Sequence, residues 1–472
     1  MLRTLVVKEW VHNLLELRFL VCAGLCVFLA VVSVLVLRED LAVKRADYSS
    51  NRTIYRDQAQ EYGSYRQLER QGVRVDRPPQ NFQVLFYGVE KTLDRTAVVG
   101  GDFLPGFQGD LSGNPAVLLF PVADLLFVVA VVLSLLAFFI SYDAVSGERE
   151  SGTLKQVLSY PVPRDLLILA KWLGGYFSLA LPFLVALVIS ALLISLSADI
   201  PFSGQDWEAF VLAGAVSLLL LAVMFSIGLF VSVRARSSTT AILTLLAIWV
   251  LLALVVPNAG PYVAEIVAPV PDVGTVEREI STRTKALSDE YSDVFRGDRR
   301  RMRNLSDTER SEFFRQMRER REELQTRVNQ ATAEVVRAYE ERVRSQTSVA
   351  RMLTRASPVA AYVYANTEIG ETGVRHEEKL VNALRVYQRE FARWVREQQE
   401  ASGGGGGGGG RGGWFGGSDD DYNIDHLPTF DFRSENLVDR VSERTVDILL
   451  LAVFAVLFFM AAFLSFVRTD VT

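Results

Sequence analysis

The chain has 472 residues, half of them apolar, and a formal net charge of −5. This mildly acidic balance argues against a general nucleic-acid binder, so no nucleic-acid partner is expected. The apolar residues gather in six long stretches that are almost free of charges, which excludes a large soluble core and indicates an integral membrane protein.

Residues 1–16 mix charged and apolar side chains, with Trp10 placed to reach the headgroup level. They predict an amphipathic helix that lies along the cytoplasmic membrane surface. The first apolar stretch, 17–37, is longer than the hydrophobic region of a signal peptide, and no small-residue cleavage site follows it. We therefore expect it to be the first membrane span.

The later apolar stretches divide the rest of the chain into spans and connecting segments. The first connecting segment contains strand-like pieces such as NFQVLFYGVE (81–90). In chain order, we expect an insertion over 38–115, a span over 116–141, a connecting segment over 142–172, spans over 173–196, 208–233 and 239–256, a second insertion over 257–446, and a last span over 447–467.

Lys and Arg in the short segments predict the orientation of the chain. They occur before the first span, in 142–172, in the turn near 234–238 and after the last span, whereas the loop 197–207 has none. We therefore expect both termini to be cytoplasmic and both insertions to be extracytoplasmic.

The second insertion contains a long charged stretch with a narrow apolar seam. Ile280, Leu287 and Val294 recur every seven residues, which is typical of coiled-coil helices. This pattern predicts a helical hairpin over about 276–345, broken near GDRRRMRNLSD (297–307), which packs on itself or on a partner copy. The glycine-rich residues 403–417 predict a flexible linker.

Motifs of independent catalysis are absent from the sequence. It contains no G-x-x-x-x-G-K-[ST] loop, no G-x-S-x-G and no H-E-x-x-H, and its three histidines, His12, His376 and His426, are scattered. We expect no catalytic residue, metal site or cofactor in this chain. Asp124, near the outer end of the second span, either faces a cavity or is simply solvated.

The connecting segment 141–172 reads SYDAVSGERESGTLKQVLSYPVPRDLLILAKW. It predicts a short amphipathic helix from Glu148 to Ser159, a corner at Pro161–Pro163, and a second helix from Arg164 into the third span. A rigid corner joined to two spans can transmit motion. Its charges of both signs favour docking on a protein over resting on an anionic lipid surface.

This segment resembles the cytoplasmic signature of the ABC-2 class of bacterial ABC transporter permeases. The likeness includes an acidic residue, a G-E-R-E-x-G-T-L core, a Pro-Val turn and a Lys-headed span. RASPVAAYVYANTEIGETG (355–373) and LPTFDF before the last span are similar to the long-extracytoplasmic-loop branch of this class. Members resembling that branch include permease-like subunits tied to gliding motility and to maturation of a copper enzyme.

The resemblance implies a mainly α, six-span permease with a type V exporter-like fold. It would work as a dimer with a second copy or a paralogue, in the bacterial cytoplasmic membrane and in contact with its lipids. ABC ATPase subunits at the cytoplasmic face would bind the ATP and Mg, and extracytoplasmic proteins are further expected partners. The implied ATPase-coupling residues are Asp143, Gly147, Glu148, Arg149, Glu150, Gly152, Thr153, Leu154, Pro161, Arg164 and Lys171.

Among these residues, Glu148, Arg149, Glu150 and Thr153 are expected to contact the ATPase. Three functions follow from the resemblance and the long insertions. An exporter subunit is favoured, a subunit that relays ATPase motion to extracytoplasmic machinery without transport is the alternative, and a sensor ranks last because the tail after Arg468 is short. The sequence does not identify the substrate.

Overall fold

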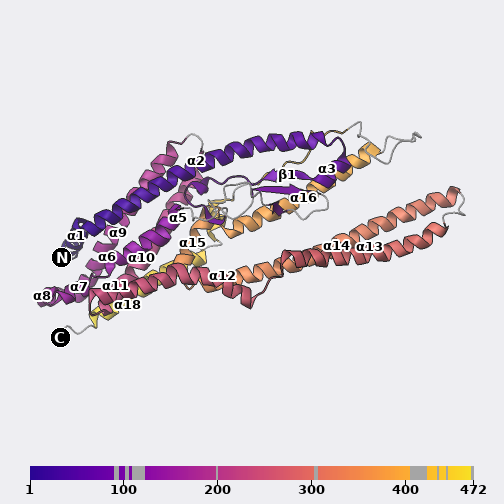
Figure 1. The fold of residues 1–472 in the computed structure, drawn as a ribbon. Helices are drawn as coiled ribbons and strands as arrows, with labels where there is room; N and C mark the ends of the chain where they lie inside the picture. The colour runs from indigo at the N-terminus through magenta and orange to yellow at the C-terminus, as the bar shows by residue number, and fades with distance from the viewer. Residues whose placement is uncertain are drawn as a thin grey trace. The chain divides into compact units, whose positions relative to one another are not determined.

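The computed structural model describes residues 1–89, 95–100, 106–108, 123–197, 200–301, 307–403, 422–432, 435–442 and 445–468 (Figure 1). The described chain is predominantly helical with little strand, which confirms the predicted fold class. Contacts divide it into two units, which are described separately below. The first comprises Met1–Ala253 and Pro358–Thr472, and the second comprises Leu254–Ser357.

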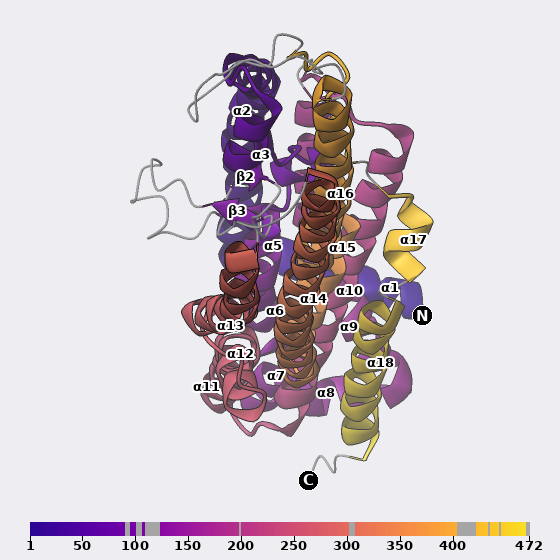
Figure 2. The ribbon, with the colours of Figure 1, turned by 90° about the vertical axis from the view of Figure 1, so that its right-hand side faces the viewer.

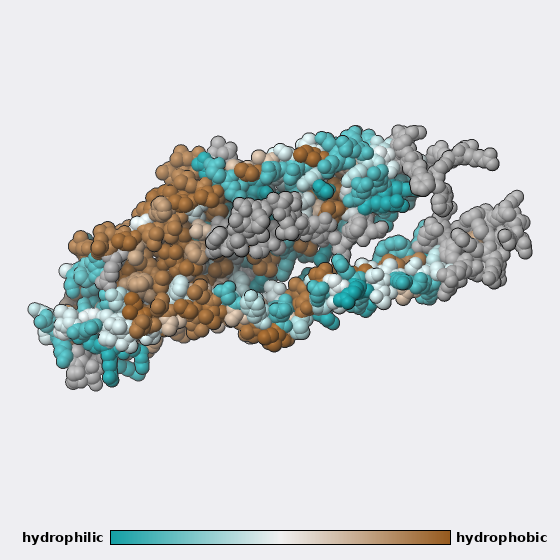
Figure 3. Space-filling model, in the orientation of Figure 1, coloured by the Kyte–Doolittle hydropathy of each residue, from teal (hydrophilic) through white to brown (hydrophobic). Residues whose placement is uncertain are grey.

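Six helical segments of the described residues are long and apolar enough to cross a membrane, as predicted. Over the spanning helices of the first unit, apolar residues gather on the surface, with polar residues beyond them (Figure 3). The candidate spans are Phe19–Glu61, Leu125–Glu150, Arg164–Ser195, Gly204–Arg234, Ser238–Val267 and Thr445–Val467.

Helix α10 (Gly204–Arg234) is the central span of the first unit. It packs against α6 (Ser134–Ser141), α9 (Arg164–Ser195), α15 (Pro358–Ile369) and α18 (Thr445–Val467). In its most apolar 18 residues 72% are buried, against 11% in α18. Small residues allow these close approaches, because membrane helices gain stability from tight packing and not from the exclusion of water.

Helix α1 (Leu2–Leu15) precedes α2 (Leu17–Glu61), which is much longer than the predicted first span. Its 45 residues correspond to about 68 Å, whereas a hydrocarbon core is about 30 Å thick. The chain remains helical beyond residue 37 because no glycine or proline interrupts it there, and Leu41 and Ala59 are buried on one side. Hydropathy identified only the apolar half of this helix.

A small antiparallel sheet follows α3 (Tyr65–Gln71). Its strands β1 (Val73–Asp76), β2 (Thr96–Val99) and β3 (Gly106–Gln108) pair in the order β1-β2-β3, with Val73 opposite Val99 and Thr96 opposite Gln108. The sheet lies between α2 and α16 (Val374–Gly403) (Figure 1, Figure 2).

The strand expected within NFQVLFYGVE is wrong, because Asn81–Val84 forms the 3₁₀ helix η1. Phe82, Gln83 and Val84 are all buried, so this apolar run has no alternating exposed face. A short apolar run of this kind does not distinguish a strand from a buried helical turn by periodicity alone.

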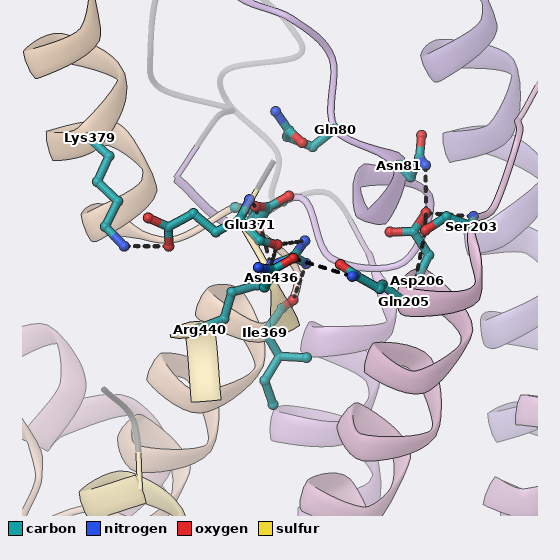
Figure 4. Close-up of polar contacts among 12 residues, drawn as sticks. Gln80, Asn81, Ser203, Gln205, Asp206, Ile369, Glu371, Lys379, Asn436 and Arg440 are labelled. Atoms are coloured by element: carbon teal, nitrogen blue, oxygen red, sulfur yellow. Dashed lines mark hydrogen bonds and ion pairs between the residues drawn. The ribbon is translucent and has the colours of Figure 1, made fainter. Parts of the chain in front are cut away.

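A hydrogen bond between the side chains of Asn81 and Asp206 joins η1 to the first turn of α10. Ser203 and Asp206 cap each other's backbone N–H groups at the start of the helix. The side chain of Asn81 donates to Asp206 at 2.9 Å, and Gln205 donates to Asn436 at 3.3 Å (Figure 4).

Helix α17 (Leu437–Ser442) is held beside the α15–α16 turn by one buried guanidinium. Arg440 pairs with Glu371 at 3.2 Å and donates to the carbonyl oxygens of Ile369 at 3.3 Å and Glu435 at 2.6 Å (Figure 4). These contacts hold α17 at the turn between α15 and α16.

In the second unit, α13 (Val273–Arg301) and α14 (Asp307–Thr354) pack together, and α12 (Val256–Val267) packs on α14. Helix α12 continues α11 (Ser238–Trp249) through the π-helical turn Val250–Val255. Within the predicted break at 297–307, residues 297–301 are still helical in α13, and residues 302–306 lie outside the described residues. Residues 404–417 of the predicted glycine-rich linker also lie outside them.

The contact between α10 and α6 depends on a glycine. A Cβ atom at Gly228 would overlap Ser141 Oγ and lie 2.8 Å from Ser141 Cβ. We predict that Gly228→Ala lowers the free energy of unfolding by about 1–3 kcal/mol through overpacking, and that adding Ser141→Gly restores part of it. Thermal unfolding of the purified protein measures both effects.

The control is Gly24→Ala on α2, because a Cβ at Gly24 meets no atom within 4 Å. It should melt at or slightly above the wild-type temperature, because alanine favours a helix over glycine. If the Gly228→Ala protein melts no lower than this control, the close contact between Gly228 on α10 and Ser141 on α6 is contradicted.

A buried histidine predicts acid sensitivity. His376 on α16 packs edge-on against Phe432, with ring centroids 5.2 Å apart. Burial first, and then three nearby cations, lower the pKa of His376 from 6.5 to about 3. These cations are Arg77, Arg440 and Lys379.

His376 is therefore neutral when folded, but it binds a proton below about pH 6.5 when unfolded. Its contribution to stability is complete above that pH and is lost as the pH falls toward 3, by about 1.4 kcal/mol per pH unit. We predict that thermal stability falls between pH 7 and pH 5 and that His376→Gln reduces this fall. Equal pH dependence in the two proteins would contradict the prediction.

Candidate functional site

The connecting segment 142–172, called the cassette below, contains two short helices. They are α7 (Ser146–Glu150) and α8 (Thr153–Ser159), whereas the sequence predicts one helix from Glu148 to Ser159. Gly152 separates them, because its φ of +74° lies in the left-handed region that glycine adopts without steric cost. After Pro163, α9 begins at Arg164, the residue at which the sequence places the second helix.

Lys171 on α9 lies at the centre of the cassette. Its side chain is 2% exposed, and its Nζ lies 2.8 Å from Glu148 Oε1 on α7 and 3.5 Å from Glu9 Oε2 on α1. An ammonium group without water needs such partners, because an unpaired buried charge costs several kcal/mol. The side chain of Lys171 therefore joins three helices.

The α1 helix approaches α9 closely beside this cluster. A Cβ atom at Gly174 would lie 2.7 Å from Glu9 Cβ and 3.1 Å from the carbonyl oxygen of Val6, so only glycine allows this approach. Helix α1 thus packs against α9, and its position at the membrane surface stays a prediction.

Arg149 and Glu150 contact the ends of two different helices. Arg149 donates to the carbonyl oxygens of Val233 at 3.0 Å and Ala235 at 2.6 Å, at the C-terminal end of α10. Glu150 accepts the backbone N–H of Ser238, at the start of α11, at 3.0 Å. Each charge has the sign that stabilises its helix end, because C-terminal carbonyls attract cations and N-terminal N–H groups attract anions.

Ser232 of α10 completes the attachment of α7. Its Oγ accepts the backbone N–H groups of Val145 at 3.0 Å and Ser146 at 3.1 Å, where α7 begins. Sequence reasoning missed this residue. Its proximity to the basic turn at 234–238 is the only signal for it in the sequence.

The apolar side of α8 packs into the bundle. Leu154 is 2% exposed and belongs to a cluster with Leu229 and Phe466. Arg164 donates to the carbonyl oxygen of Val467 at 3.3 Å, at the C-terminal end of α18. The cassette is therefore in contact with the last span as well.

The exposed side of the cassette carries charges of both signs among uncharged groups. Tyr160 is 68% exposed. The other exposed residues of the cassette up to Asp165 are Glu150, Ser151, Gly152, Thr153, Lys155, Gln156, Ser159, Pro161, Pro163 and Asp165.

The structure thus brings the predicted site residues into one segment and gives them different environments. Glu148 and Arg149 bond to other helices of the chain, Glu150 is exposed but bonds to α11, and Thr153 is exposed. Gly147 is half-buried, and its N–H donates to the carbonyl oxygen of Asp143 at 2.9 Å. Contact with an ATPase stays a prediction for all of them.

Asp124, the other candidate, is 6% exposed, which excludes simple solvation. It accepts the N–H of Phe127 at 2.8 Å, which caps α5 (Leu125–Phe127), and the N–H of Tyr87 at 2.9 Å. Its structural role is thus a cap that also fixes the chain after η1. In the described part of the chain, no group of three or more His, Cys, Asp or Glu side chains is placed to hold a metal ion.

Comparison with known proteins gives a family match over nearly the whole chain. The model of a family described as ABC-2 family transporter protein matches residues 3–471. A probable ABC transporter permease protein NosY of Pseudomonas aeruginosa is 36% identical over 134 residues, which cover 27% of this chain and 46% of that protein. The protein of the same name from Stutzerimonas stutzeri is 30% identical over 154 residues, covering 31% and 56%. The chain thus spans about half the length of these curated relatives.

Loss of the central cation should destabilise the cassette. We predict that Lys171→Met lowers the free energy of unfolding by about 3–5 kcal/mol, because it leaves the carboxylates of Glu148 and Glu9 without their buried partner. Adding Glu148→Gln should restore part of the loss. Lys155→Met, in the same cassette but exposed, is the matched control and should unfold at the wild-type temperature. A Lys171→Met protein as stable as this control would contradict the ion-pair cluster.

Proposed function

Because the chain belongs to the ABC-2 family of transporter proteins, we propose that it is the membrane-spanning permease subunit of an ABC transporter. Separate ATPase subunits bind ATP and Mg and power it. The printed names of its relatives, which are probable ABC transporter permeases, support this proposal. The absence of a phosphate-binding loop from the sequence also supports it.

The proposed location is the bacterial cytoplasmic membrane, with both termini and the cassette in the cytoplasm. The distribution of Lys and Arg among the short segments supports this orientation. An even number of spans is consistent with both termini on the same side, and in this orientation the long segments after the first and fifth spans are extracytoplasmic.

The cassette is the proposed coupling element between the ATPase and the spans. The observation that carries this role is its attachment to several helices at once. Glu148 bonds to Lys171 on α9, Arg149 to the end of α10, and Glu150 to the start of α11. A displacement of α7 and α8 is thereby transmitted to several spans, whereas a flexible tether would absorb it.

Within this element the residues divide into two roles. Glu148, Arg149 and Glu150 are positioning residues, since their side chains already bond to the rest of the chain. The proposed ATPase contact is the exposed side of α8 and the following turn, which includes Thr153, Lys155 and Tyr160.

The transporter is proposed to be an exporter that works as a dimer with a second copy or a paralogue. Exposed apolar side chains on α2, α11 and α18 suit contact with lipid or with another spanning helix. The alternative, a subunit that relays motion without transport, is favoured by the long charged helices α13 and α14, whose ion pairs Arg283–Glu279 and Arg327–Glu323 lie on solvated faces. Extracytoplasmic proteins are its proposed partners.

Co-purification with the nearest-encoded ABC ATPase tests the coupling surface. We predict that Lys155→Glu with Tyr160→Ala lowers the amount of ATPase recovered at least about tenfold, because a loss of about 1.4 kcal/mol or more changes affinity by that factor. The protein itself should remain folded, since both side chains are exposed.

The matched control is Lys285→Glu with Tyr262→Ala, which makes the same changes at exposed residues of the second unit. It should retain the ATPase. Retention by both double variants would refute contact through α8, and absence of any associated ATPase with the wild-type chain would refute the proposed coupling altogether.

A further inference from the structure

A cavity of about 440 Å³ lies in the first unit between α2, β1, α16 and residues 425–430. This volume is within the range of about 300–1,000 Å³ that is usual for ligand sites. Tyr387 and Phe430 are buried in its wall, with ring centroids 5.7 Å apart. Two half-buried rings on one face of α2, those of Tyr48 and Tyr55, also line the cavity. This cavity has no part in the proposed coupling of the ATPase to the spans, because the cassette contributes none of its lining residues.

One wall of the cavity is the free edge of the sheet, since β1 is an outer strand. The N–H of Arg77 donates to the carbonyl oxygen of Arg95 at 2.8 Å. In an antiparallel pair the hydrogen-bonded positions alternate, so Val75 and Val73 also bond to β2. The backbone N–H and C=O groups of Arg74 therefore point away from β2.

In the described ranges of the chain, no backbone hydrogen bond reaches Arg74 from the side opposite β2. All four residues of β1 line the cavity. Because successive side chains of a strand point to opposite faces, a cavity lined by four consecutive residues borders the edge of the strand. Unpaired edge groups of this kind are a template for another strand.

The rim of the cavity is positively charged. The rim carries three exposed arginines, Arg52, Arg56 and Arg74. It carries two acidic side chains, those of Asp76 and Asp425. Among the residues that the structure describes, Arg56 has an ion pair with Asp425 at 3.7 Å, whereas Arg52 and Arg74 have none.

The carboxylate of Asp76 is engaged by neutral donors. Asn51 donates to it at 2.7 Å, Tyr55 at 3.2 Å and Thr96 at 2.7 Å. Among the described residues it forms no ion pair with Arg52 or Arg74. Two guanidinium groups beside an unpaired strand edge complement an extended chain that carries carboxylates.

We propose that this cavity binds an extended acidic peptide segment of a partner protein, which adds as a strand beside β1. The segment exchanges backbone hydrogen bonds with Arg74, places its acidic side chains at Arg52 and Arg74, and packs apolar side chains on Tyr387 and Phe430. The free backbone groups along the cavity favour a peptide over a small anion, which would need only the arginines and the rings.

The test uses the full chain in detergent and a fluorescein-labelled octapeptide of alternating Glu and Val, with binding measured by fluorescence anisotropy. The decisive comparison is Arg74→Pro with Arg74→Ala. Both remove the guanidinium, but only proline removes the outward N–H, and it leaves the bonds between β1 and β2 in place. We expect Arg74→Pro to bind the peptide about tenfold more weakly than Arg74→Ala.

A second comparison leaves the protein unchanged. The same peptide with alternate backbone nitrogens methylated keeps its charge but loses donors, and it should bind the wild-type chain at least about tenfold more weakly. This comparison decides the matter if thermal unfolding shows that Arg74→Pro is not folded.

Three results would overturn strand addition. They are equal affinity of the Arg74→Pro and Arg74→Ala proteins, equal binding of the methylated peptide, and no binding of the octapeptide at millimolar concentration. Either of the first two would instead assign the cavity to anions recognised by charge and ring contacts alone. None of these outcomes depends on whether an ATPase binds the cassette.

Discussion

The position of the cassette depends on one buried ammonium group. Lys171 has almost no contact with solvent, so Glu148 and Glu9 must lie beside it, and this requirement fixes α7 and α1 against α9. Once Glu148 is fixed, the next two residues along α7 reach the facing ends of α10 and α11. The ion-pair cluster thus joins three helices, and Arg149 and Glu150 extend the contacts of the cassette to two more.

Local sequence was sufficient for the parts of the fold that depend on composition. Six apolar stretches predict six spans, because the hydrocarbon core imposes a length and excludes charge wherever a helix crosses it. The same reasoning stopped at residue 37, although α2 continues to Glu61, because the C-terminal half of this helix is polar and packs against the later elements β1 and η1. The break at Gly152 was missed for a related reason: a glycine permits a left-handed residue but does not require it.

The candidate site was predictable as a group of residues but not as a set of contacts. The G-E-R-E core points to one segment, yet a motif does not state which side chains face the protein. Glu148 and Arg149 face it because their partners, at positions 171, 233 and 235, come from other helices. Ser232 was missed because single serines are common in apolar membrane helices. Its role depends on the start of α7, which packs beside it in the folded chain and donates two backbone N–H groups to it.

The unbroken length of α2 has a mechanical consequence. Beyond Gly24 it has no glycine or proline at which to bend, and it packs along α9, the helix that carries Lys171. Such a helix behaves as a lever: over about 68 Å, a tilt of about 5° displaces the far end by about 6 Å. Tyr48, Arg52 and Tyr55 lie on that far half, in the wall of the β1 cavity. A small rotation of the N-terminal half of α2 would therefore be amplified into a change in the width of the cavity that its C-terminal half lines.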